Sequence, residues 1–176
     1  MSTIYLDNAA TTKVREEVVS VISSIIKNEY GNPSSTHSYG RSSKSLIESS
    51  RKEIADILNV KSSEIIFTSG GTEGDNMIIR NCVNNLGVSH IITTKIEHHA
   101  VTHTIDDLIR SNNINVSYVK VSKSGHVDLN DLEEILKRSD EKSLVSLMHI
   151  NNEIGNITDI QLVSEICQKY NSLFHS

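Results

Sequence analysis

Short apolar runs with strand character alternate with longer amphipathic runs through the second half of this chain. The strand-like runs lie at 90–94, 116–121, 144–148 and 173–175. The runs between them repeat apolar residues at helical spacing, over about 101–109, 129–136 and 160–170. This alternation predicts an α/β fold with a mostly parallel sheet flanked by helices.

The first part of the chain shows helical patterns around one loop. Residues 1–12 predict an ordered arm, and 30–37, which holds the only proline, predicts a turn-rich loop. A helix is expected after the arm, with Val14, Val18, Val21, Ile22, Ile25 and Ile26 on one face. A second is expected over 41–58, with Leu46, Ile47, Ile54, Ile57 and Leu58 facing inward. We divide the chain into the arm, 1–12, and a larger domain, 13–176.

A glycine turn lies in the stretch 65–76, Ile-Ile-Phe-Thr-Ser-Gly-Gly-Thr-Glu-Gly-Asp-Asn. Four residues with strand preference lead into the glycines, and Thr72 opens a helical segment. The glycines let the backbone approach a ligand, and the free N–H groups and dipole of a helix N-terminus favour an anion. Thr72 could cap the helix and donate its hydroxyl to a phosphate. An ordinary strand-to-helix connection would explain the same residues.

Three polar clusters follow predicted strands at their carboxyl ends, where ligands bind in parallel α/β sheets. They are 69–72, 97–99 and 151–153. His98 is either a capping or surface histidine or an imidazole over a flat conjugated ligand, able to move protons near neutral pH. A metal site at 97–99 is disfavoured because adjacent helical residues do not share a face. An asparagine at 151–152 could bind a ring oxygen or carboxylate, or serve only the turn.

Composition excludes several classes of protein. The net charge is −5 with no basic stripe, so we expect no nucleic-acid partner. No apolar run is long enough for a bilayer and no secretory signal is present, which predicts a cytoplasmic protein without a membrane partner. Cys82 and Cys167 are far apart and fall on apolar helical faces, so we interpret both as packing residues.

Five segments in order make the sequence resemble the NifS/IscS-type cysteine desulfurases, in the class V aminotransferase group of pyridoxal 5′-phosphate (PLP) enzymes. They are Tyr-Leu-Asp-Asn-Ala-Ala-Thr-Thr at 5–12, Gly-Asn-Pro-Ser-Ser at 31–35, Ile-Phe-Thr-Ser-Gly-Gly-Thr-Glu at 66–73, Glu-His-His-Ala-Val at 97–101 and Asn-Asn-Glu-Ile-Gly at 151–155. The resemblance covers nearly the whole chain. It implies part of the large domain of the fold type I PLP-dependent transferases.

The resemblance also implies residue roles. Gly71 and Thr72 would hold the PLP phosphate, His98 would stack on the pyridine ring and assist proton transfer, and Asn152 would contact the phenolic oxygen or the substrate carboxylate. The implied reaction removes sulfur from L-cysteine and leaves alanine and an enzyme persulfide, for iron–sulfur cluster or thio-cofactor assembly. A homodimer and a sulfur-acceptor protein are the implied partners. Gly74 stands where the family often has serine or alanine.

Family members continue well past residue 176. The Schiff-base lysine, the persulfide-forming cysteine and the substrate-binding arginine belong to that later part. We therefore expect an N-terminal fragment that by itself releases no sulfide from L-cysteine with PLP. Selenocysteine lyase, another class V aminotransferase, and a non-catalytic truncated product that only associates with a partner remain alternatives.

Overall fold

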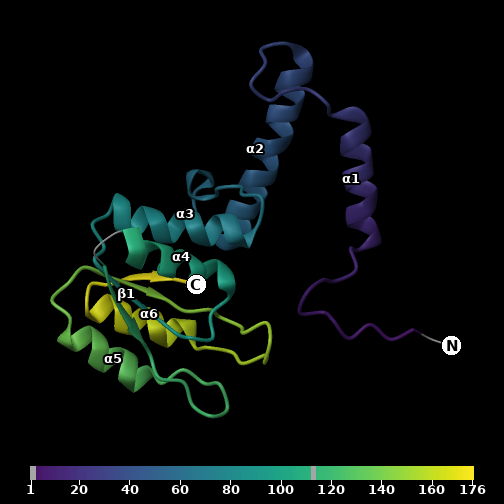
Figure 1. Cartoon of the computed structure of the whole chain (residues 1–176). Helices are drawn as coiled ribbons and strands as arrows, with labels where there is room; N and C mark the ends of the chain where they lie inside the picture. Colours follow the sequence, from purple (N-terminus) through teal and green to yellow (C-terminus); the bar gives the residue numbers. More distant parts are fainter. Residues whose placement is uncertain (1–2, 112–113) are drawn as a thin grey trace. The chain divides into compact units, whose positions relative to one another are not determined.

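The computed structural model describes residues 3–111 and 114–176, so residues 1 and 2 of the predicted arm lie outside the described residues. The chain forms two compact units, Met1–Phe67 and Thr68–Ser176 (Figure 1). We describe each unit by itself. The proposed division into 1–12 and 13–176 stays a prediction.

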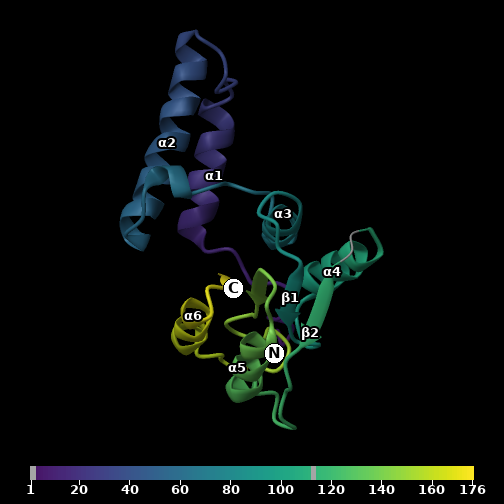
Figure 2. The same cartoon turned by 90° about the vertical axis from the view of Figure 1, so that its left-hand side faces the viewer.

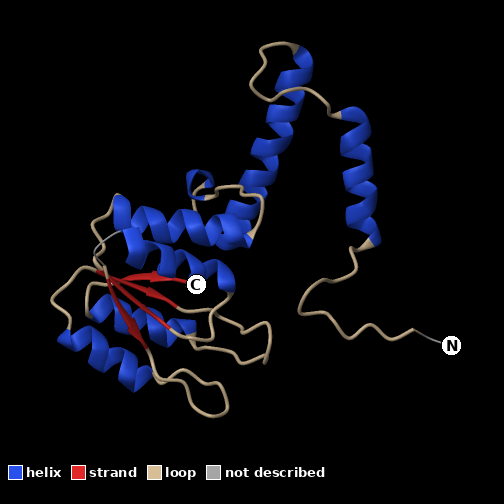
Figure 3. Cartoon of the chain, in the orientation of Figure 1, coloured by secondary structure: helices blue, strands red, loops and turns tan. Residues whose placement is uncertain are grey.

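A four-stranded parallel sheet lies at the centre of unit 68–176. The strands, red in Figure 3, are β1 (His90–Thr93), β2 (Asn115–Tyr118), β3 (Ser143–Ser146) and β4 (Leu173–His175). Their spatial order is β2-β1-β3-β4. Ile91 of β1 lies opposite Val116 of β2 and Leu144 of β3. The predicted parallel sheet is confirmed, although β2 and β3 end earlier than the sequence pattern indicated.

Two helical layers cover this sheet, with α3 and α4 on one side and α5 and α6 on the other (Figures 1 and 2). The helices are α3 (Gly71–Asn84), α4 (His99–Ser111), α5 (Leu129–Arg138) and α6 (Ile160–Lys169). Adjacent residues of a strand point to opposite faces. Ile91 therefore packs with α3 and α4, whereas Ile92 packs with α5 and α6. The predicted α/β class is confirmed.

Unit 1–67 contains helices α1 (Glu16–Asn28) and α2 (Ser38–Leu58) and the 3₁₀ turn η1 (Ser62–Glu64). The prediction that the apolar residues of 41–58 face inward is wrong: Leu46 is half-buried, and Ile47, Ile54, Ile57 and Leu58 are exposed. No residue of α1 is buried either. Among the described residues of this unit no sheet supplies a second layer, so helical spacing does not lead to burial.

The loop that joins α1 to α2 is the tightly packed part of this unit. His37 caps α2 by accepting the Gly40 N–H at Nδ1, 3.3 Å away. A Cβ at Gly40 would lie 2.4 Å from the Ser35 carbonyl oxygen and 2.6 Å from that of Asn32. The turn predicted over 30–37 is confirmed, and its close backbone contacts require glycine at position 40.

The prediction of a strand at 65–68 is wrong. Ile65 is extended, with φ −93° and ψ 119°, but the segment pairs with no strand among the described residues. Ile66 and Phe67 remain exposed. Extended backbone becomes a strand only when a neighbour completes its hydrogen bonds, and residue preference alone does not provide one.

Cys82 and Cys167 are both buried and free, one in each core cluster. Burial raises the pKa of the Cys82 thiol and raises that of Cys167 to about 11. Both therefore pack as small apolar side chains, as predicted. Over the described ranges, no helix has the length and apolar character needed to cross a membrane.

Candidate functional site

The segments that leave the carboxyl ends of β1 and β3 are fastened to each other. The Asn151 side-chain amide donates to the Ile96 carbonyl oxygen at 2.9 Å. The Met148 N–H donates to both carboxylate oxygens of Glu97, each at 3.1 Å. The clusters predicted at 97–99 and 151–153 therefore lie at one edge of the sheet, as expected for a parallel α/β fold.

The third cluster forms the N-terminus of α3. Gly70 is the N-cap residue, and no side chain in the described part of the chain caps the helix. Thr72 is the second helical residue, so the prediction that it caps the helix is wrong. The Glu73 carboxylate accepts the Ser69 N–H at 2.5 Å, and this hydrogen bond lowers its pKa. Glu73 thus binds the N–H before the helix and leaves the first helical N–H groups without a side-chain partner.

Gly70 and Gly71 border open space. A Cβ built at either position meets no atom within 4 Å. Packing among the described residues of unit 68–176 therefore does not require glycine at either position. Small residues beside an uncapped helix N-terminus leave room for an anionic group against the backbone N–H groups. By this observation the residues fit a phosphate.

His98 lies directly before α4, and the interpretation of it as a capping or surface histidine is confirmed, whereas its contact with a flat ligand stays a prediction. Its Nδ1 accepts the Ala100 N–H at 3.1 Å, which caps the helix. In the neutral ring the remaining proton is then on Nε2. The side chain is exposed, and its ring centroid lies 6.2 Å from that of His99 in a tilted arrangement. His99 is also exposed and stacks on His103, with ring centroids 4.8 Å apart.

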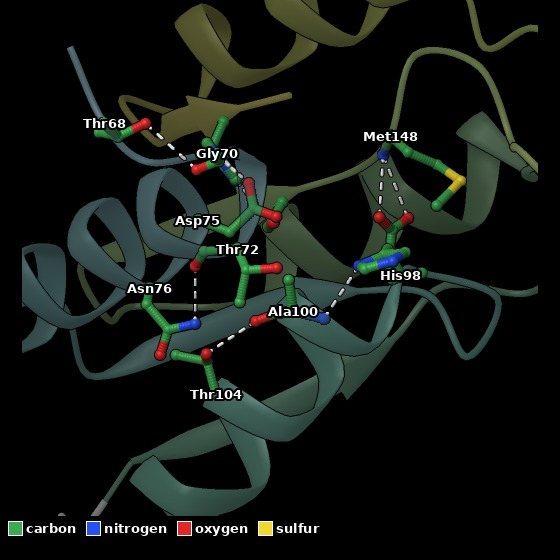
Figure 4. A network of polar contacts seen from close by, with 12 residues as sticks. Thr68, Gly70, Thr72, Asp75, Asn76, His98, Ala100, Thr104 and Met148 are labelled. Atoms are coloured by element: carbon green, nitrogen blue, oxygen red, sulfur yellow. Dashed lines mark hydrogen bonds and ion pairs between the residues drawn. The ribbon is translucent and has the colours of Figure 1, made fainter. Parts of the chain in front are cut away.

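Thr72 and His98 line the same cavity, of about 260 Å³. Asn76 and Arg80 of α3 and His103 of α4 line it as well. The Asn76 side chain donates to the Thr72 carbonyl oxygen at 2.9 Å (Figure 4). Small-molecule sites usually begin at about 300 Å³, so this cavity has the size for one part of a small ligand.

Asn152 lies on the loop after β3 but not around this cavity. Its side chain is exposed, and its amide donates to the adjacent Glu153 carboxylate at 3.2 Å. Asn151 is the buried residue of the pair and also accepts the N–H groups of Glu153 and Ile154. The structure therefore brings Gly71, Thr72 and His98 together. Asn152 lies on a loop at the same edge of the sheet, outside the cavity.

Sequence reasoning missed a polar group beneath this site. Asp75 of α3 lies 3.5 Å from Nε2 of His175, whose Nδ1 contacts the Ser146 hydroxyl at 3.0 Å. Burial lowers the pKa of His175, and Asp75 partly opposes that shift. Asp75 follows Thr72 by three residues on α3, so the two lie on neighbouring turns of the same helix (Figure 4). No local pattern indicates this group, because its three residues lie on separate elements far apart in the sequence.

A larger hollow, of about 580 Å³, lies beside β2 and α5, away from these residues. Four of its charged side chains form ion pairs, Lys120 with Asp131 at 2.6 Å and Arg138 with Glu134 at 3.1 Å, and the Glu141 carboxylate accepts hydrogen bonds from Ser89 and Asn115. It offers no uncapped helix N-terminus. We therefore place the candidate site at the smaller cavity.

The sequence matches the family "Aminotransferase class-V" over residues 4–176. The chain belongs to this family. It is similar to the cysteine desulfurase IscS of Dictyoglomus turgidum, with 43% identity over 98% of this chain and 44% of that protein. The resemblance stated from the sequence is thereby confirmed.

Two solved structures share the fold. A NifS-like protein from Rickettsia africae is 39% identical, with a TM-score of 0.85, over 99% of this chain and 47% of that one. SspA in complex with cysteine is 30% identical, with a TM-score of 0.89, over 98% of this chain and 50% of that one. The chain thus spans about half the length of the relatives it matches or somewhat less.

Proposed function

We propose that this chain supplies the phosphate- and ring-binding part of the site of a PLP-dependent cysteine desulfurase. The observation that carries the proposal is the cavity shared by Thr72 and His98 beside the uncapped N-terminus of α3. The backbone N–H groups from Gly71 onward and the Thr72 hydroxyl would bind the phosphate. The exposed ring of His98 would stack on the pyridine.

PLP, when bound, supplies an electron-withdrawing ring that stabilises negative charge on the substrate carbon. The residues of this chain bind and orient it. Because Nδ1 of His98 is held by the Ala100 N–H, Nε2 is the atom at which this residue would hold or release a proton. Asn152, on the exposed loop after β3, would contact the phenolic oxygen or the substrate carboxylate.

The proposed substrate is L-cysteine, and the proposed partners are a sulfur-acceptor protein and a second copy of the chain. Support for the substrate comes from relatives named cysteine desulfurase and from the SspA structure, described as a complex with cysteine. A cytoplasmic location remains part of the proposal. Selenocysteine would fit the same phosphate and ring contacts, so these residues do not separate the two substrates.

Binding of pyridoxine 5′-phosphate tests the proposal. This analogue lacks the aldehyde and so cannot react with surface lysines. We expect saturable binding to the 176-residue chain by calorimetry, tighter than that of inorganic phosphate because the ring adds a stacking contact, and no binding of pyridoxine. Absence of saturable binding of the phosphorylated analogue would contradict the proposal.

Three variants assign the contacts. Thr72→Val should weaken the binding of both inorganic phosphate and pyridoxine 5′-phosphate about tenfold. A hydrogen bond to a charged group contributes about 1.5–3 kcal/mol. His98→Asn keeps an acceptor that can cap α4 but removes the ring, so it should weaken only pyridoxine 5′-phosphate. Thr102→Val on α4, which lines neither cavity near the site, is the matched control.

A further inference from the structure

Glu97 is a buried carboxylate at the edge of the candidate site, with 9% of its surface exposed. Besides the two contacts from the Met148 N–H, one of its oxygens accepts the Thr94 hydroxyl at 3.0 Å. Burial raises its pKa in spite of these bonds, and the nearby charge of Asp75 adds to the increase. Burying a carboxylate costs free energy that hydrogen bonds must offset, and these three bonds do so for Glu97.

The three bonds of Glu97 hold the turn that presents His98. Thr94 follows β1 and Met148 follows β3, so the carboxylate joins the ends of two neighbouring strands. The Asn151 amide, from the same segment after β3, also holds this turn by donating to the Ile96 carbonyl oxygen. The two residues directly before His98 are thereby fixed to the segment after β3 before α4 begins.

Glu97 and His98 also border one small cavity, of about 80 Å³, on the side toward the sheet. Asp75 of α3 and His175 of β4 border it too. The cavity around Thr72 adjoins His98 on the other side. His98 therefore lies between the cavity of Thr72 and a group of ionisable side chains, in which Glu97 is buried and Asp75 and His175 are half-buried.

We propose that Glu97 is a positioning residue for His98. It holds the 94–98 turn so that the imidazole ring faces the ligand in the cavity of Thr72, and it makes no ligand contact itself. This inference rests on the proposed function, because it assigns the ring of His98 to the ligand. It differs from a purely structural role, which would affect all ligands of the site or none.

The ratio of two dissociation constants, for inorganic phosphate and for pyridoxine 5′-phosphate, measures the ring contribution. Phosphate needs only α3 and Thr72, whereas the analogue also needs a correctly placed His98. Glu97→Gln keeps the shape but leaves one oxygen to accept from both Met148 and Thr94. We expect this variant to lower the ratio by about threefold or more and to leave the phosphate constant unchanged, since stacking on a side-chain ring contributes about 1–3 kcal/mol.

Glu141→Gln is the matched control. The Glu141 carboxylate also accepts two side-chain bonds, from Ser89 at 2.8 Å and Asn115 at 2.7 Å, but it borders neither cavity at the site. The ratio of the two dissociation constants in Glu141→Gln should equal that of the original chain. Thr94→Val removes a single bond of Glu97 and should lower the ratio less than Glu97→Gln does. If Glu97→Gln fails to fold, as judged by circular dichroism, Thr94→Val decides the test.

The outcomes separate the two proposals. If the original chain binds the analogue no better than phosphate, the ring contact of the proposed function is wrong. If the original chain binds the analogue better, and both Glu97→Gln and Thr94→Val keep the ratio of the original chain, only the positioning role of Glu97 is overturned. A parallel loss of both ligands in Glu97→Gln would show a structural role and would also overturn it.

Discussion

Helices of the two units carry similar apolar patterns and bury them differently. In unit 68–176, α5 buries Leu132 and Leu136 against the sheet. In unit 1–67, α1 has its apolar residues on one face and buries none of them. Helical periodicity predicted both helices correctly. It predicts burial only where a second layer is present, and the sheet of unit 68–176 is that layer.

The largest expected effect tests this difference with two isoleucines, both in helices. Ile79→Ala in α3 removes a side chain that is 0% exposed and should lower the free energy of unfolding by about 2–5 kcal/mol. Ile57→Ala in α2 changes a side chain that is 82% exposed and should cost less than about 0.5 kcal/mol. Urea denaturation measures both. A large loss for Ile57→Ala would mean that this face of α2 is covered in solution.

Two helical glycines reverse the comparison. Gly40→Ala should destabilise by about 1–3 kcal/mol, because the added methyl would collide with the Ser35 and Asn32 carbonyls. Gly74→Ala should stabilise by about 0.5–1 kcal/mol, because its Cβ would meet only the Thr68 hydroxyl, at an ordinary 3.9 Å. Melting temperatures of the two variants should move in opposite directions. Equal shifts would contradict the tight packing assigned to the loop before α2.

The smallest effect concerns buried His90 at the start of β1. Its ring contacts the hydroxyls of Ser117 and Ser139, each at 2.9 Å, and burial lowers its pKa from the usual 6.5 although Glu141 opposes the shift. The unfolded chain therefore takes up this proton at higher pH than the folded chain. The contribution of neutral His90 to the free energy of unfolding is therefore complete above about pH 6.5. It is lost as the pH falls toward the pKa of His90 in the folded chain.

Urea midpoints between about pH 5 and 7 measure this loss. His90→Gln keeps hydrogen-bonding groups but cannot titrate, so the dependence on pH should become shallower. It should not vanish, because the pKa of His175 is lowered in the same direction. An unchanged pH dependence in the variant would show that His90 does not contribute.

Much of unit 68–176 could be predicted from the sequence, because each of its strands and helices has a local pattern that the sheet then satisfies. At 65–68 the sequence predicted a strand that the structure does not have. Strand preference leads to a strand only beside a partner strand, and the described residues do not provide one there. His98 could be singled out because it follows β1, at the edge of the sheet where topology places ligands. Gly71 and Thr72 could be singled out by the glycine turn at the start of a helix, although the strand predicted before them is not present among the described residues. The roles of all three toward a ligand stay predictions. Asp75, Glu97 and His175 act through contacts between distant segments, which leave no local signal.

The open space beside Gly70 and Gly71 has a consequence for mutagenesis. Where a polypeptide needs glycine for its own packing, selection for folding and selection for ligand recognition remove the same replacements. At these two positions no neighbouring atom opposes a side chain. A library randomised at these two positions should therefore retain many residue types under a screen for folded protein and few under a screen for phosphate binding. The difference between the residue types retained in the two screens would report how closely a ligand approaches the main chain.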